Sequence, residues 1–133
     1  MITTDMHVHS CFSSDSSEQM EAIIETAIRK GFSYVYFTDH HDERFPVHPS
    51  APDMTFQLDF DRYISKLQDL REQYKNTIEV RFGVEQGICP EVAPDIDAIS
   101  NRYPFDFIIG SSHLTRLENG DPYYPEYYAN KTN

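Results

Sequence analysis

The chain has 133 residues, with 22 Asp or Glu against 11 Lys or Arg and a formal net charge of −11. This length predicts one domain that can bury a core unaided, and the shortage of clustered basic residues argues against nucleic acid as the main partner. No apolar run approaches the roughly 20 residues of a membrane span, no signal-peptide pattern opens the chain, and Cys11 and Cys89 lack C-x-x-C spacing, so we expect a reduced, cytoplasmic protein.

The first part of the chain predicts a strand, a helix and a second strand. The opening strand spans Ile2 to His7. From Ser17 to Lys30, apolar residues recur at helical spacing, so we predict a helix that begins at a Ser16-x-x-Gln19 capping box. The β-branched and aromatic run from Ser33 to Thr38 predicts a buried strand.

A long loop separates these elements from a further alternation of helices and strands. Asp39 to Asp59 is rich in Pro, His and charge and has no period, and loops of this length in compact domains are often functional. We then predict a helix from Phe60 to Tyr74, a strand from Ile78 to Glu85, a helix from Val92 to Arg102 and a strand from Phe105 to Gly110. Strands that alternate with amphipathic helices predict an α/β fold with a parallel sheet and right-handed crossovers.

Side chains with metal-binding chemistry stand where the predicted strands end. The residues at those ends are His7, His9, Asp39, His40, Glu85, Ser112 and His113. Because the carboxyl ends of parallel strands share one face, these residues should converge. His7 and His9 are two apart on an extended segment, so both imidazoles can reach one ion. Nitrogen and carboxylate ligands suit Zn²⁺, Mn²⁺ or Fe²⁺, and we predict a divalent metal site.

Four short motifs resemble those of the polymerase and histidinol phosphatase (PHP) superfamily, with spacing most similar to its histidinol-phosphatase branch. They are "DMHVHS" (Asp5 to Ser10), "TDHH" (Thr38 to His41), "GVE" (Gly83 to Glu85) and "SSH" (Ser111 to His113). The D-x-H-x-H pattern alone would also suit an amidohydrolase. The resemblance implies a distorted, TIM-like (βα)₇ barrel, and barrels of this type need roughly 200 residues or more. We therefore expect residues 1–133 to be a single PHP domain truncated on its C-terminal side, the N-terminal portion of the barrel with about four parallel strands.

The resemblance also implies up to three divalent metal ions in the complete domain. The implied ligands are His7, His9 and Glu85 for the first ion, Glu85 and His113 for the second, and His40 and Asp15 for the third. Asp5 and Asp39 are expected to orient imidazoles. The remaining ligands of the superfamily, a further histidine and a late D-x-H pair, have no counterpart in this sequence. We therefore expect residues 1–133 alone to hold fewer than three ions and to hydrolyse phosphate esters poorly or not at all.

The activity that the resemblance implies is hydrolysis of a phosphomonoester, L-histidinol phosphate of histidine biosynthesis. Arg116 is a predicted phosphate contact, since a guanidinium matches phosphate oxygens bidentately, although it can equally be an exposed loop residue. His41 either donates a proton to the leaving alkoxide or faces water. His48 lies in the long loop near two prolines, and no role is predicted for it.

Two other functions stay open at this point. One is a phosphoesterase for another small phosphate ester, such as a nucleotide, and the other is a non-catalytic metal-binding module. In each enzyme case the expected partner is a small phosphorylated substrate, with neither nucleic acid nor membrane. An open barrel edge also predicts self-association, because unpaired strand groups invite pairing with another chain.

Overall fold

A computed structural model describes residues 3–47, 52–53, 55–116 and 122–123, and the side chains of all of these except 115–116 and 122–123. The elements in chain order are β1 (Thr4–Val8), α1 (Met20–Arg29), β2 (Tyr34–Phe37), β3 (His40–His41), α2 (Phe60–Tyr74), β4 (Glu79–Gly87), a 3₁₀ turn (Pro90–Val92), α3 (Ala93–Arg102), β5 (Phe107–Ser111), β6 (Thr115–Arg116) and β7 (Pro122–Tyr123).

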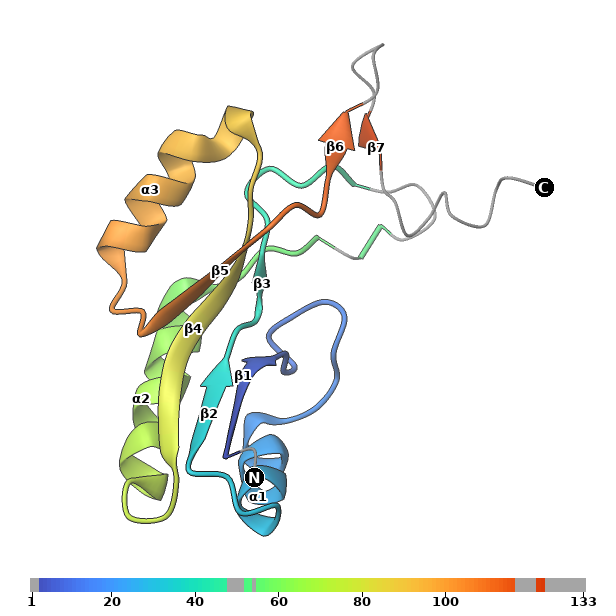
Figure 1. Cartoon of the computed structure of the whole chain (residues 1–133). Coiled ribbons are helices and arrows are strands. Elements are labelled where there is room, and N and C mark those ends of the chain that lie inside the picture. The colour runs from blue at the N-terminus through green and yellow to red at the C-terminus, as the bar shows by residue number, and fades with distance from the viewer. Residues whose placement is uncertain (1–2, 48–51, 54, 117–121, 124–133) are drawn as a thin grey trace, which may run out of the picture.

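The main sheet is parallel and curled (Figure 1). β1 pairs with β2, β2 and β3 lie one after the other beside β4, and β4 pairs with β5 on its other side, all in parallel register. The sheet thus has four parallel strand lines, each joined to the next through a helix, which confirms the predicted α/β class. The strands point the same way, so their carboxyl ends gather at one edge of the sheet (Figure 1).

Strand alternation divides β4 between the core and the opposite face of the sheet. Val80, Phe82 and Val84 are almost fully buried and belong to the hydrophobic core. Because successive side chains point to opposite faces, the residues between them, including Glu85 at the carboxyl end, face away from that core. The helices supply the other half of the core through Met20, Ile24 and Ala27 of α1 and Tyr63, Ile64, Leu67 and Leu70 of α2.

The predicted capping box is wrong. Gln19 is the N-cap of α1 and its side chain makes no capping hydrogen bond. The Ser16 hydroxyl lies 3.3 Å from the carbonyl oxygen of His9 and donates to it, so this serine ties the loop back to β1. The helix therefore begins at Met20, three residues later than predicted.

Two predicted boundaries also change because of pairing and proline. β3 forms inside the predicted long loop, where His40 pairs with Glu85 and His41 with Gln86. β4 extends to Gly87, which pairs with Ser111 of β5. The third helix is preceded by a separate 3₁₀ turn that begins at Pro90. The strand β3 forms because it pairs with β4, and it could not be predicted because two residues are too few to show an alternation of apolar side chains.

The outer strands have one neighbour each within the described residues: β1 pairs with β2, and β5 pairs with β4. In the same part of the chain, no helix is long and apolar enough to cross a membrane. The extent of the domain in residues 1–133 and its truncation stay predictions.

Gly83 offers a test of how tightly β4 packs against β2. A Cβ at Gly83 would lie 2.7 Å from the carbonyl oxygen of Phe37 and 2.8 Å from Thr38 Cγ2, whereas a Cβ at Gly110 of β5 would meet only Ile88 carbons at 3.7 Å. We expect Gly83→Ala to destabilise the protein by about 1–3 kcal/mol, because backbone must move. Gly110→Ala, the matched control, should change stability by less than about 1 kcal/mol in either direction. Urea unfolding of both variants measures this, and equal stabilities would contradict the packing described.

Candidate metal centre

The predicted convergence at the carboxyl ends of the strands is observed. Seven side chains with metal-ligating atoms gather there, from β1 and the loop after it, β3 and its end, β4, and the segment after β5. They are His7, His9, Asp15, His40, Asp42, Glu85 and His113, and they form three overlapping groups in which the ligand atoms lie within 4.8 Å of one another. All six predicted metal ligands are therefore brought together, with Asp42 added.

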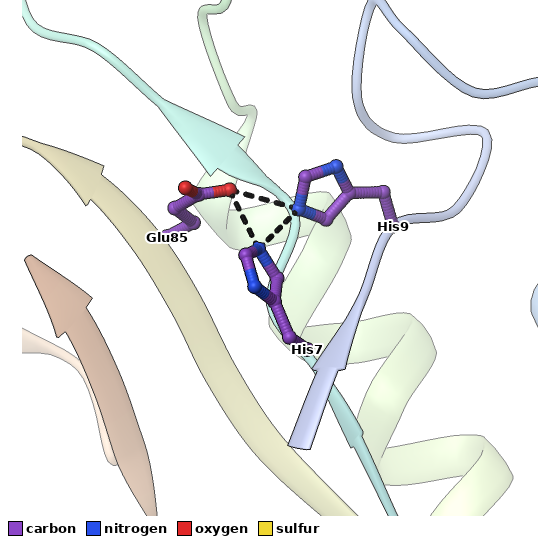
Figure 2. Close-up of side chains that lie close together, drawn as sticks. All are labelled: His7, His9 and Glu85. Atoms are coloured by element: carbon purple, nitrogen blue, oxygen red, sulfur yellow. Dashed lines mark hydrogen bonds and ion pairs between the residues drawn. The ribbon is translucent and has the colours of Figure 1, made fainter. Parts of the chain in front are cut away.

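The first group is centred on one oxygen of Glu85 (Figure 2). His7 Nε2 lies 3.0 Å and His9 Nε2 lies 2.8 Å from Glu85 Oε2, and the two ring nitrogens are 3.0 Å apart. Two imidazole nitrogens and a carboxylate oxygen thus point at one spot. This donor set fits a divalent transition metal, which is commonly bound by nitrogen and oxygen atoms that converge in this way.

The second group joins the two histidine-bearing strands through Asp15. Asp15 Oδ2 lies 3.1 Å from His9 Nδ1 and 3.2 Å from His40 Nε2. The rings of His9 and His40 pack edge to face with centroids 4.4 Å apart. Asp15 therefore contacts one imidazole from the end of β1 and one from β3, and it can contribute a ligand to an ion held beside His40.

The third group lies on the other side of His40. Asp42 Oδ1 lies 2.9 Å from His113 Nδ1, and His113 Nε2 lies 2.9 Å from Glu85 Oε1. His40 Nδ1 is buried, forms no hydrogen bond with the described residues and lies 3.6 Å from Asp42 Oδ2. A buried nitrogen left without a partner is costly, and a cation would satisfy it. The residues present thus fit a metal on this side as well.

Glu85 connects the groups because its two oxygens face opposite ways. Oε2 faces His7 and His9, while Oε1 accepts hydrogen bonds from His113 and from the Ser111 hydroxyl at 2.6 Å. Burial alone would raise the pKa of this carboxyl, but the hydrogen bonds from His113, His9 and the other donors outweigh it and hold the pKa well below its usual range. Glu85 therefore stays ionised at any physiological pH.

The carboxylates also change the protonation of their histidines. Burial lowers the pKa of His113, but the hydrogen bonds to Asp42 and Glu85 outweigh it and raise the pKa to about 10. Hydrogen bonding to Glu85 is the main cause that raises the pKa of His9. Burial would raise the pKa of Asp42, but its hydrogen bonds to His113 and the nearby charge of His40 outweigh burial and lower it. In the metal-free protein the cluster thus holds protons where a metal would bind.

Asp39 anchors the loop that carries Asp15, and does not orient an imidazole as predicted. Its carboxylate is fully buried and accepts hydrogen bonds from Ser10 N, Ser10 Oγ and Ser13 Oγ at 2.6 to 3.0 Å. Ser13 Oγ in turn accepts from the backbone N–H of His40 at 2.8 Å. The carboxylate of Asp5 accepts from the backbone N–H of His7 at 3.2 Å, and its role in orienting the His7 imidazole stays a prediction.

Asp42 is the residue that sequence reasoning missed. It is 5% exposed and stands two residues after His40, so strand alternation places both on the same side. That spacing, the same as between His7 and His9, was the available signal. Gly87 makes room for it, since a Cβ there would lie 2.0 Å from Asp42 Oδ1.

The predicted catalytic residues lie elsewhere or outside the description. His41 points to the opposite face from His40, where its ring contacts Leu58, Glu43 and Phe60, so the geometry argues against proton donation to a group bound at the cluster. The two histidines are adjacent in the strand β3, and adjacent side chains of a strand point to opposite faces of the sheet. The side chain of Arg116 and the whole of His48 lie outside the described residues.

Known proteins resemble this chain over most of its length. The PHP domain model matches residues 5–132. The histidinol-phosphatase of Lactococcus lactis subsp. lactis (strain IL1403) is 34% identical over 109 residues, which cover 82% of this chain and 38% of that protein. The probable histidinol-phosphatase of Clostridium acetobutylicum is 31% identical over 110 residues, covering 83% and 39%.

A solved structure shares the fold of this chain. The crystal structure of histidinol phosphate phosphatase from Lactococcus lactis, complexed with zinc, L-histidinol and phosphate, superimposes with a TM-score of 0.76 at 33% identity. The match covers 84% of this chain and 40% of that one. The chain thus spans 38 to 40% of the length of these relatives.

The cluster predicts metal binding that depends on particular side chains. Protein purified without chelator should contain at least one equivalent of divalent metal, and His7→Ala and Glu85→Ala should reduce this content strongly because each removes a donor from the first group. His48→Ala is the histidine control and should leave the content unchanged. Elemental analysis checks this, and equal occupancy in all three variants would show that these histidines were wrongly chosen.

The raised histidine pKa values predict proton release when a metal binds. The metal-free protein holds a proton on His113, whose pKa is about 10, at neutral pH, and a bound cation must displace protons from the cluster. Zn²⁺ affinity should therefore fall as pH decreases from 8 to 6. Calorimetric titrations in buffers of different ionisation enthalpy measure the released protons, and binding without proton release would contradict the assigned protonation.

Proposed function

Because this chain belongs to the PHP domain family, we propose that it carries the metal-binding face of a phosphatase that hydrolyses histidinol phosphate. The observation that carries the proposal is Glu85, with histidines from the ends of β1, β3 and β5 around its two oxygens. The names of the relatives support the substrate, since both curated relatives are described as histidinol-phosphatases and the solved one was crystallised with L-histidinol and phosphate.

The proposed ligands are the six predicted ones, with Asp42 as the carboxylate that orients His113. They are His7, His9, Asp15, His40, Glu85 and His113. The proposed cofactor is Zn²⁺, Mn²⁺ or Fe²⁺, with up to three ions in the complete domain. Bound divalent ions would supply hydroxide at neutral pH and neutralise charge on the phosphate.

The chain's own residues hold this chemistry in place. Glu85 stays ionised, and the Ser111 hydroxyl fixes the orientation of its Oε1. Asp42 holds His113 through Nδ1 and so directs Nε2 at Glu85. A cavity of about 100 Å³ beside this pair, lined in part by Gly87, Ile88 and Cys89, gives a small substrate room next to the cluster. Arg116 stays a proposed phosphate contact.

A second candidate is a non-catalytic metal-binding module. It rests on the ligand cluster alone, because converging imidazoles and carboxylates can hold a metal without hydrolysing an ester. A phosphatase for another small ester is separated from both by a substrate panel. Localisation in the cytoplasm stays a prediction.

Turnover of histidinol phosphate tests the proposed function. We expect metal-loaded protein to release phosphate from it faster than from nucleotide monophosphates, and Glu85→Gln to reduce the rate at least about 100-fold, because the bridging carboxylate charge is lost. Glu21→Gln is the matched control, because Glu21 pairs with Lys66 between helices α1 and α2. Metal binding without turnover of any ester would favour the non-catalytic module.

We also propose that two copies of this chain associate with each other through their edge strands. The edge strands β1 and β5 expose Met6 (39%) and Ile108 (37%), and within the described residues each has a single strand neighbour. Both run in the same direction, so β5 of one copy beside β1 of a second would continue the parallel sheet. Two such contacts related by a twofold axis would close a barrel.

Light scattering tests the association. The wild-type chain should give a mass above its 15.5 kDa, and the double variant Met6→Lys, Ile108→Lys should shift it toward the monomer because charged edges resist pairing. Val47→Lys, at an exposed apolar residue outside the edge strands, is the control. A wild-type monomer at all concentrations would overturn this part of the proposal.

A further inference from the structure

His41 is a buried histidine that the proposed reaction does not use. It is 4% exposed, although it neighbours His40 in the cluster. Its ring packs on Phe60, the first residue of α2, with centroids 4.6 Å apart. A buried polar ring on the core side of the sheet needs partners for both nitrogens, and His41 has them.

The hydrogen bonds define which nitrogen of His41 carries the proton. The backbone N–H of Leu58 lies 3.1 Å from Nδ1 and can only donate, so Nδ1 accepts. Nε2 therefore carries the hydrogen and donates to Glu43 Oε2 at 3.1 Å. The ring thus links two points of the loop between β3 and α2, one on each side.

β3 depends on such links because it is only two residues long. Its register places His40 beside Glu85 and His41 beside Gln86, and the Gln86 amide donates to the carbonyl oxygen of His41 at 3.2 Å. Further along, the backbone N–H of Asp42 donates to the carbonyl oxygen of Phe56 at 2.8 Å. A rotation of this short segment would swing His40 and Asp42 together away from Glu85 and His113.

We infer that His41 is a positioning residue, whose bonds to Leu58 and Glu43 hold β3 so that His40 and Asp42 face the cluster. This inference rests on the proposed metal site. His41 acts through the backbone and contacts neither metal nor substrate. It selectively serves the groups that contain His40, whereas the His7, His9 and Glu85 group is held by β1 and β4.

Three variants of His41 separate its bonds from its shape. His41→Asn keeps an acceptor near Nδ1 for Leu58, His41→Gln keeps a donor near Nε2 for Glu43, and His41→Phe keeps ring area on Phe60 without either bond. Leu67→Ala, which opens a cavity at a fully buried position in α2, controls for general destabilisation. Metal stoichiometry and affinity are measured by titration with Zn²⁺ and with Co²⁺, whose absorption reports the ligand set.

His41→Phe should lower the affinity for the ions bound by His40 about 10- to 100-fold, as expected when a group that orients metal ligands is lost. The ion at His7, His9 and Glu85 should remain, and His41→Asn or His41→Gln should restore most of the lost affinity. Leu67→Ala should lower the melting temperature without changing stoichiometry. Wild-type binding by His41→Phe, or the same loss in Leu67→Ala, would overturn the inference.

Nuclear magnetic resonance of the metal-free protein separates this inference from the proposed function. The imidazole nitrogens of His41 should show the Nε2–H tautomer, and His41→Phe should shift the ring signals of His40 and His113 but not those of His7. If wild-type protein bound no metal, the proposed function would fail, while these shifts would still support positioning. Unchanged His40 and His113 signals would overturn it.

Discussion

Glu85 is the residue on which the arrangement of the cluster depends. Its carboxylate lies at the carboxyl end of the central strand and accepts contacts from His7, His9, His113 and Ser111, which come from both sides of that strand. A buried negative charge is costly unless several donors or cations satisfy it. Here the histidines satisfy it in the metal-free state, and the same donor atoms fit bound cations. The charge of Glu85 thus couples all three groups.

The parallel sheet is what makes this convergence possible. β4 lies between the β2–β3 line and β5, so residues 45 or more positions apart along the chain become neighbours at one edge, as His40 and Glu85 do. The hydrophobic core under the sheet, which includes Val80 of β4 and Leu70 of α2, holds the strands at fixed spacing. Alternation then assigns each side chain to the core or to the cluster, and a shift of one residue would exchange them.

Support for the cluster comes from polar groups that touch no proposed ion. Asp39 fixes the serine-rich loop that carries Asp15, and Ser13 of that loop accepts from the backbone N–H of His40. The hydrogen bonds of His41 fix β3 on the other side of His40. His40 lies between these two anchors. The proposed ligands lie in motifs that the sequence shows, whereas the supporting bonds are seen only in the folded chain.

The order of the predicted strands and helices and, with the family resemblance, six of the seven clustered side chains could be predicted from the amino-acid sequence. The alternation of apolar residues in strands and their recurrence every three to four residues in helices depend on neighbours close in the chain. Histidines at the ends of the predicted strands can be identified from the same pattern. Contacts in the folded chain were needed to show that β3 forms, that Asp42 joins the cluster and that His41 turns into the core. These outcomes depend on β4, which pairs with His40 and His41 from more than 40 residues away. A two-residue strand carries too short a pattern to predict, because its stability comes from the distant partner and not from its own residues.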